Sequence, residues 1–260
     1  MMKTLSRLTL ACALVSLCGP AAAGKTVISL GYLLHESQSL DDNLNQFDRT
    51  TLSLANINAG DWGRIVTVGI VDNLEKSASY NGPANGGEDW STYKLAFTGD
   101  FKTGIKGLNT MFKNVSYYNV NGYENNLALG LSYDIKALDA SWYFSGGYMY
   151  STGSNAWGTD FQGDWGGYHL EFKMDKPITD NTSIGVRYIG MHDRTQQHAD
   201  IMYGGISETD GNKNGYCADI NLSYRFSNKI QTNLALRQLH AWYGYKNTAN
   251  ILYMGAQYAF

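Results

Sequence analysis

The feature that most constrains this chain is an alternation of apolar and polar residues with a period of two. In YHLEFKM (168–174), every second residue is apolar and the residues between are His, Glu and Lys. NLALGLSYD (126–134) and ADINLSYRF (218–226) repeat the pattern. Successive side chains of a strand point to opposite faces, whereas a helical stripe would recur every three or four residues. The pattern therefore predicts strands with one apolar and one polar face.

The alternation predicts twelve strands, at 25–34, 48–57, 62–72, 91–101, 112–119, 126–135, 141–152, 167–176, 182–191, 215–226, 230–242 and 250–260. Short and long connections follow one another strictly, and the long ones are rich in Gly, Asn, Asp and Ser. In an outer-membrane barrel, tight turns lie on the periplasmic side and longer loops outside. The sequence therefore predicts an all-β fold, a transmembrane antiparallel up-and-down β-barrel of about 12 strands.

The last ten residues, ILYMGAQYAF, alternate up to Phe260. A bilayer offers no water to an unpaired amide, so we expect this strand to pair with the first one. A terminal aromatic residue suits the membrane interface. It also resembles the C-terminal signature that barrel-assembly machinery recognises, which makes this machinery a predicted partner through Phe260. A buried edge strand in a soluble sandwich is the alternative.

The N-terminal residues are typical of a secretory signal peptide. Lys3 and Arg7 precede a largely apolar run of ten residues (8–17), and small residues follow up to Ala23. We expect 1–23 to be a signal peptide and 24–260 the barrel, exported through the periplasm to the cell outer membrane. Removing 1–23 leaves 18 basic (20 − 2) and 23 acidic residues, a net charge of −5. This mild acidity argues against nucleic acid as a partner.

Catalysis and metal binding find little support in the sequence. His192 lies beside Asp193 at the end of a predicted strand, but adjacent strand residues point to opposite faces and no serine motif accompanies them. The histidines are scattered and Cys217 stands alone in the mature chain, so no metal-ligand spacing occurs. We predict no enzyme activity, no metal site and no cofactor.

Function is expected in the lumen, because the outer face is committed to lipid. The lumen-facing positions mix acids, bases, amides and aromatic rings, whereas an ion filter would favour one sign of charge. Such a lining suits a small neutral solute with a flat ring and hydroxyl groups; alternatively, these residues only fill a narrow barrel. The predicted lining residues are Phe112, Asn114, Tyr118, Asn126, Asp134, Tyr143, His169, Glu171, Lys173, Arg187, Asp219, Asn221, Arg225, Arg237 and Tyr253.

A nucleoside base could stack on the ring of Phe112, Tyr118, Tyr143 or Tyr253. Such stacking contributes roughly 1–3 kcal/mol per base in nucleic-acid sites.

In 230–242, Leu239 falls out of phase with Leu234 and Leu236, which suggests a β-bulge.

The chain also resembles the Tsx-like nucleoside-specific channel-forming proteins of the outer membrane, the OmpK-like group. The segment GDWGGYHLEFKMDKPITDNTSIGVRYIGMHD (163–193) carries an Asp-Trp strand, a Pro-containing turn and a strand ending Tyr-x-Gly, as in that family. Further similar segments are 48–72, 111–120 and 253–260. The second predicted strand departs from the family. This chain has Thr51, Ser53 and Ala55 at positions where the family has more acidic and aromatic residues.

The resemblance implies a twelve-stranded monomeric barrel whose narrow, aromatic-lined lumen passes nucleosides and deoxynucleosides. It also implies outer loops that serve as phage or colicin receptors.

Two other functions remain open, and a third, an autotransporter translocator, is not expected. One is a surface receptor or adhesion barrel that acts through its long loops, 73–90 and 192–214. Another is a porin for a different small solute such as a sugar; a channel for acidic sugars would need a ladder of basic residues, against which the mixture of acids and bases argues. An autotransporter translocator would need a passenger and a lumen helix ahead of residue 25.

Overall fold

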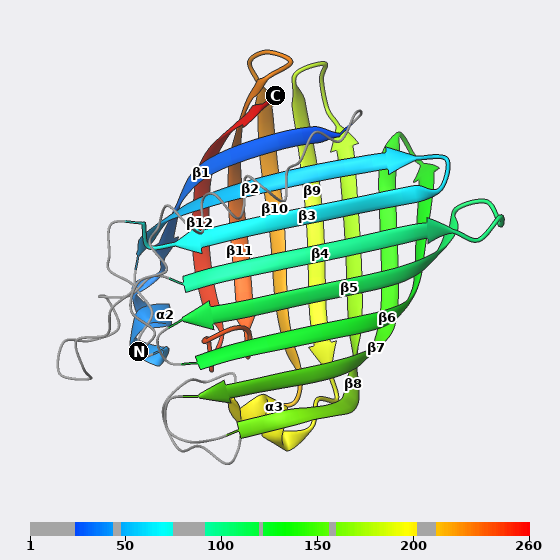
Figure 1. Cartoon of the computed structure of the whole chain (residues 1–260). Helices are drawn as coiled ribbons and strands as arrows, with labels where there is room; N and C mark the ends of the chain where they lie inside the picture. The colour runs from blue at the N-terminus through cyan, green and yellow to red at the C-terminus, as the bar shows by residue number, and fades with distance from the viewer. Residues whose placement is uncertain (1–23, 44–47, 75–91, 120–121, 156–159, 202–211) are drawn as a thin grey trace.

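The computed structural model describes residues 24–43, 48–74, 92–119, 122–155, 160–201 and 212–260, so the predicted signal peptide lies outside the described residues. Within them the chain forms twelve strands and two short helices (Figure 1). In chain order these are β1 (Lys25–His35), α2 (Ser37–Asp42), β2 (Arg49–Gly60), β3 (Gly63–Asp72), β4 (Thr92–Lys102), β5 (Leu108–Asn119), β6 (Gly122–Ala137), β7 (Ala140–Asn155), β8 (Asp160–Pro177), β9 (Thr182–His192), α3 (Gln196–Ile201), β10 (Gly215–Arg225), β11 (Ile230–His240) and β12 (Ala249–Ala259).

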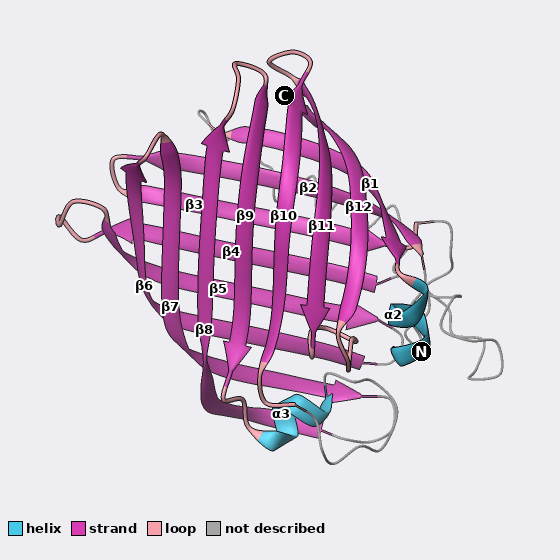
Figure 2. Ribbon diagram, turned by 180° about the vertical axis from the view of Figure 1, so that it is seen from behind, coloured by secondary structure: helices cyan, strands magenta, loops and turns pink. Residues whose placement is uncertain are grey.

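The strands form one closed barrel in which each strand pairs antiparallel with its neighbours along the chain. Closure comes from β1 and β12, which pair from Val27 with Ala259 to His35 with Ile251. The predicted up-and-down barrel is confirmed, as is the pairing of the terminal strands. Seen from behind, the same sheet continues without a break around the molecule (Figure 2).

The short connections lie at one end of the barrel, and α2 and α3 lie at the other, within long connections (Figure 1). Most strand boundaries fall within a few residues of the predicted ones. The largest difference is β8, which begins at Asp160 rather than at residue 167. There the alternation is interrupted, because the pairing of β7 with β8 shifts register between Tyr148 and Tyr150 and again between Ser151 and Gly153.

The outer face of the barrel is largely apolar. Leucine and isoleucine side chains cover its middle, for example Leu30, Leu131, Ile220 and Leu236, which are 53–68% exposed. Aromatic residues lie toward both ends, among them Phe226, Tyr258 and Phe260 at the end of the short turns and Tyr118, Tyr148 and Trp165 at the other. This is the arrangement that lipid contact requires of a membrane barrel.

None of the helices in the described part of the chain has the length and apolar character needed to cross a bilayer.

The bulge predicted at Leu239 is wrong. β11 pairs with β10 and with β12 in an unbroken register. Leu239 points inward, where it is 6% exposed and packs with Leu33, Cys217 and Ile251. An apolar cluster inside the barrel, rather than a change of register, accounts for the leucine in the inward phase.

A new charged side chain should lower stability more on the lipid-facing side of a strand than on its lumen-facing side. We expect Leu222→Arg, on the lipid-facing side of β10, to lower the free energy of unfolding by about 2–4 kcal/mol, because an arginine near the bilayer midplane is poorly solvated. The neighbouring lumen-facing change Asn221→Arg is the matched control and should cost less. Urea unfolding in lipid vesicles, followed by tryptophan fluorescence, measures both; equal losses would contradict the assigned faces.

Candidate functional site

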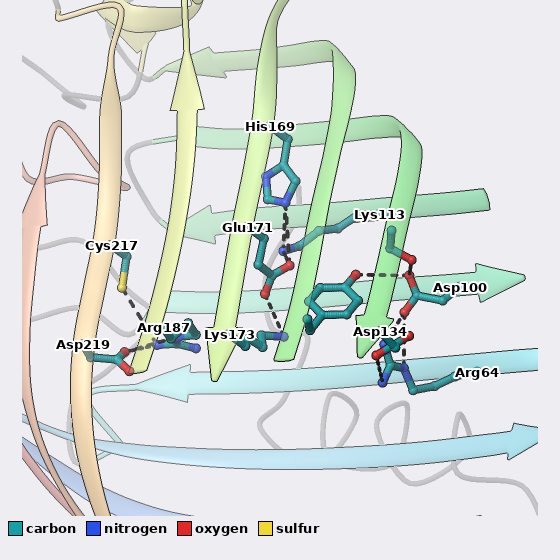
Figure 3. Close-up of polar contacts among 12 residues, drawn as sticks. Arg64, Asp100, Lys113, Asp134, His169, Glu171, Lys173, Arg187, Cys217 and Asp219 are labelled. Atoms are coloured by element: carbon teal, nitrogen blue, oxygen red, sulfur yellow. Dashed lines mark hydrogen bonds and ion pairs between the residues drawn. The ribbon is translucent and has the colours of Figure 1, made fainter. Parts of the chain in front are cut away.

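A cavity of about 600 Å³ lies inside the barrel. Its lining comes from inward-facing residues of β2 to β9 and from Trp242 and Tyr243 of the connection between β11 and β12. On β6 to β9 the lining is largely polar and charged, whereas on β2 to β5 it includes several aliphatic side chains. The charged side chains gather around three carboxylates, Glu171, Asp219 and Asp100 (Figure 3).

Glu171 of β8 lies between two lysines. Lys113 of β5 donates from Nζ to Glu171 Oε2 at 2.8 Å, and Lys173 Nζ forms an ion pair with Oε1 at 2.7 Å. His169 Nε2 lies 3.4 Å from Lys113 Nζ. Lys113 is 8% exposed and Glu171 4% exposed, so each charge is compensated where water is scarce.

Asp219 of β10 lies between two arginines. Arg187 of β9 donates to Oδ2 from Nε at 3.1 Å and also from Nη2, and Arg237 of β11 donates from Nε at 3.3 Å. Cys217 Sγ lies 3.9 Å from Arg187 Nη2. One carboxylate therefore holds two guanidinium groups from its two neighbouring strands against the barrel wall.

Asp100 of β4 completes the set. Arg64 of β3 donates to Asp100 Oδ2 at 2.6 Å and lies 3.7 Å from Asp134 of β6. Ser132 Oγ donates to Oδ1 at 2.6 Å and the Tyr143 hydroxyl at 3.1 Å. Here one base, Arg64, lies between two acids, Asp100 and Asp134, whereas each of the other two clusters has one acid between two bases.

The two inward-facing rings predicted to stack with a base are already in contact with cations. Arg64 and Lys173 lie over the Tyr143 ring, at 5.1 and 5.2 Å from its centroid. Arg237 lies 5.5 Å from the centroid of Tyr253, whose ring lies against Gly31 of the wall. Cation–π contacts of this kind compete with a solute for the ring faces.

The connection at 241–248, which we call the mouth strap, folds into the barrel at the end of the long connections. Its backbone closes on itself through two hydrogen bonds between Trp242 and Tyr245. Tyr243 is 9% exposed, stacks on Tyr117 of β5 at 5.5 Å and accepts a hydrogen bond from Asn126 Nδ2 at 3.2 Å. Trp242 and Tyr243 therefore form one end of the cavity.

Tyr245 anchors the same strap on the opposite wall. Its hydroxyl accepts from Arg49 Nη2 at 2.9 Å and is hydrogen-bonded to His35 Nε2 at 2.8 Å. Burial raises the pKa of Tyr245 to about 12, and burial next to Glu124 also raises that of Tyr243. Both phenols therefore stay protonated and uncharged near neutral pH.

Two further buried side chains hold the two ends of the strap. Arg194, which is 1% exposed, donates to the carbonyl of Ala241 at 3.1 Å and to the carbonyls of residues 212 and 213. On the other side, Asn43 donates to the carbonyl of Thr248 at 3.3 Å. The strap is thus a fixed constriction of the barrel mouth.

Most of the predicted lining residues do face the interior. These are Asn126, Asp134, Tyr143, His169, Glu171, Lys173, Arg187, Asp219, Asn221, Arg225, Arg237 and Tyr253. The cavity brings together Asn126, Asp134, Tyr143, His169, Glu171, Lys173 and Arg187. Arg225 lies apart from them, exposed at the end of the short turns.

The prediction for β5 is wrong. Phe112, Asn114 and Tyr118 face outward, and Tyr118 is 54% exposed. Phe112 packs edge-on against Phe97 of β4, and Asn114 Nδ2 donates to Asn125 Oδ1 of β6 at 2.9 Å. The three residues lie on the lipid-facing side and do not line the lumen.

The physical reason for this error is a strand with two mixed faces. One phase of β5 holds Met111, Lys113 and Val115, and the other holds Phe112 and Asn114. Lys113 is the signal that sequence reasoning missed: a charged residue is costly in hydrocarbon, so its phase should face the lumen. Arg64 and Asp100, the missed residues of β3 and β4, carry the same signal.

The histidine that suggested an active site is on the outer face. The ring of His192 stacks on Tyr168 at 5.4 Å, and its Nε2 is hydrogen-bonded to the Tyr188 hydroxyl at 2.8 Å. Within the described ranges, no group of three or more His, Cys, Asp or Glu residues is placed to hold a metal ion.

No family model matches the sequence. No curated protein matches it either. The fold is similar to solved structures described as a NanC porin (TM-score 0.54, 12% identity, 90% of this chain and 98% of that chain), a KdgM porin (0.50, 10%, 90% and 99%) and the COG4313 outer membrane channel from Pseudomonas putida F1 (0.50, 13%, 91% and 95%). At these identities the likeness is one of fold.

Location follows from the barrel itself. A closed antiparallel barrel of twelve strands with an apolar outer face and aromatic residues toward both ends is the architecture of an outer-membrane protein. The chain is located in the outer membrane, as the sequence predicted.

The hydrogen bonds that hold the mouth strap should protect it from proteolysis. Arg194→Met removes three hydrogen bonds from a charged donor, each contributing about 1.5–3 kcal/mol. The strap should then open more often, so trypsin should cut after Lys246 at least about tenfold faster. Mass spectrometry of fragments over time measures the rate. Arg225→Met, at the opposite end of the barrel, is the control; an unchanged rate in Arg194→Met would show that this arginine does not hold the strap.

Proposed function

We propose that this chain is an outer-membrane channel through which small neutral solutes diffuse passively, with nucleosides as the solute class. The observation that carries the proposal is the cancellation of charge in the cavity. Its lining includes four basic and four acidic residues, a formal sum of zero (4 − 4): Arg64, Lys113, Lys173 and Arg187, and Asp100, Asp134, Glu171 and Asp175.

Cancelled charges suit a neutral solute, because no single-sign field attracts or repels ions along the path. Amide, hydroxyl and paired charged groups offer hydrogen bonds of about 0.5–1.5 kcal/mol net each. Several weak contacts allow passage, where one tight site would trap the solute. The volume of about 600 Å³ is within the range of small-molecule pockets and is ample for a nucleoside.

A porin for acidic sugars is a weaker candidate. Such a channel would need basic groups free to meet carboxylates, but each base that lines the cavity has an acidic neighbour. Lys113 and Lys173 share Glu171, Arg187 pairs with Asp219, and Arg64 pairs with Asp100.

The other predicted partners stay predictions. Much of the two longest outer loops, predicted at 73–90 and 192–214, lies outside the described residues, because 75–91 and 202–211 are not described. Phe260 points outward at the end of the terminal strand, 72% exposed, where assembly machinery could reach it.

Single-channel recording in planar bilayers tests the proposal. We expect the purified protein to conduct ions and its current to be blocked by adenosine or thymidine but not by glucose at the same concentration. A conducting protein that nucleosides leave unaffected would remove the nucleoside assignment and keep the channel. Absence of conductance would remove the channel and favour a receptor barrel.

Ion selectivity tests the balance of charge. The wild-type channel should discriminate weakly between K⁺ and Cl⁻. Asp219→Asn leaves Arg187 and Arg237 without their shared carboxylate, so the reversal potential in a KCl gradient should shift toward anions, at least about twofold in permeability ratio. Asp139→Asn, in an exposed turn, removes the same charge outside the lumen and should leave the ratio unchanged. Equal shifts in both variants would show that Asp219 does not face the ion path.

A further inference from the structure

A continuous aliphatic surface lines the cavity on one side of the barrel. Val68 of β3 is at its centre and is paired with Ala55 of β2 and Ala96 of β4. Ala96 is paired in turn with Val115 of β5, so one row of small aliphatic side chains crosses four neighbouring strands. We call this surface, with the residues in the next paragraph, the aliphatic wall.

The rows on either side extend the wall. Ile57 of β2 pairs with Val66 of β3 on the side of the short turns, and Ile70 follows Val68 on the side of the mouth strap. These side chains and those of Val68 and Val115 are half-buried and line the cavity. The wall therefore presents branched methyl groups to the lumen.

Such a surface is unusual in this position. The inner face of a membrane barrel is normally polar, because it borders water. Here the aliphatic rows lie beside the charged groups Arg64, Asp100 and Lys113 of the same strands, and Glu171 and Asp134 lie on other strands of the same cavity. A solute that enters thus meets methyl groups on one side and hydrogen-bonding groups on the other.

The wall also offers a solute an apolar surface that the two rings predicted to stack with a base do not offer. Tyr143 and Tyr253 have cations over their rings, so they are poor stacking surfaces for a solute. The methyl groups of Val68 and Val115 carry no such competitor, and apolar contact with them needs no specific ring geometry.

We propose that the aliphatic wall selects, among small neutral solutes, those with one apolar face and one hydrogen-bonding edge, and that Val68 and Val115 are its specificity-determining residues. The inference rests on the proposed channel function and adds the class of solute. A sugar that is polar on all sides cannot cover the wall, and it leaves the methyl groups in water. An amphipathic solute of the same size covers the wall and still reaches the polar side.

Two probes of nearly equal mass separate these cases. Phenyl β-D-glucoside has one apolar face, and glucosylglycerol is polar throughout. We expect phenyl glucoside to half-block the channel current at a concentration at least about tenfold lower than glucosylglycerol does. Equal half-blocking concentrations in the wild-type protein would overturn the inference.

The variant Val68→Thr/Val115→Thr keeps side-chain shape and strand propensity but replaces two methyl groups by hydroxyls. The preference for phenyl glucoside should fall by about fourfold per methyl group, or roughly tenfold or more in the pair. The control is Val27→Thr, an inward-facing valine of β1 that does not line the cavity. A pair variant with normal conductance and unchanged preference would refute the role of the wall and leave the channel standing.

Two measurements keep the outcomes distinct. If the threonine pair fails to give a folded band on an unheated gel, Val68→Ala/Val115→Ala removes the methyl groups without adding hydroxyls and should also lose the preference; a retained preference counts against the wall. If the wild-type protein does not conduct, the proposed function fails, and equilibrium dialysis of both probes against the detergent-solubilised protein then decides whether the wall binds the amphipathic one.

Discussion

The pairing of backbone amides with other backbone groups is the constraint on which this structure depends. Hydrocarbon supplies no hydrogen bonds, so each strand needs a partner on both sides and the sheet has to close. Closure is made by β1 and β12, and it explains why the alternation continues to the end of the chain. It also commits every second residue to lipid, which leaves only the inward phase for polar function.

The inward-facing side chains are subject to a second constraint. A charged group in a narrow lumen is poorly solvated, so it needs an oppositely charged partner. Three carboxylates organise these partners: Glu171 between two lysines, Asp219 between two arginines, and Asp100 beside Arg64. The Asp219 cluster joins neighbouring strands, whereas the Glu171 and Asp100 clusters also join strands that are three apart in the barrel. The mouth strap bounds the cavity at one end with uncharged phenols.

Strand positions could be predicted because alternation and turn residues are local signals. The face of a strand that points inward was harder to predict where both faces mix polar and apolar residues. In β5 the aromatic and amide residues Phe112, Asn114 and Tyr118 resembled a lumen lining, but the neighbouring Lys113 has its partner Glu171 on β8, far away in sequence. The partner of a charge depends on which strands lie near one another across the barrel, and alternation within one strand contains no such information.

The sequence by itself determined the number and order of the strands, the closed barrel, the membrane location and the inward orientation of twelve predicted residues, because each follows from a period of two and from the cost of unpaired groups in lipid. Only the tertiary structure decided which charges pair, how the strap at 241–248 enters the mouth, and that Val68 and Val115 meet in one aliphatic wall. These features depend on register between strands and on the folding of a loop into the lumen, and both are set by packing among residues distant in the chain.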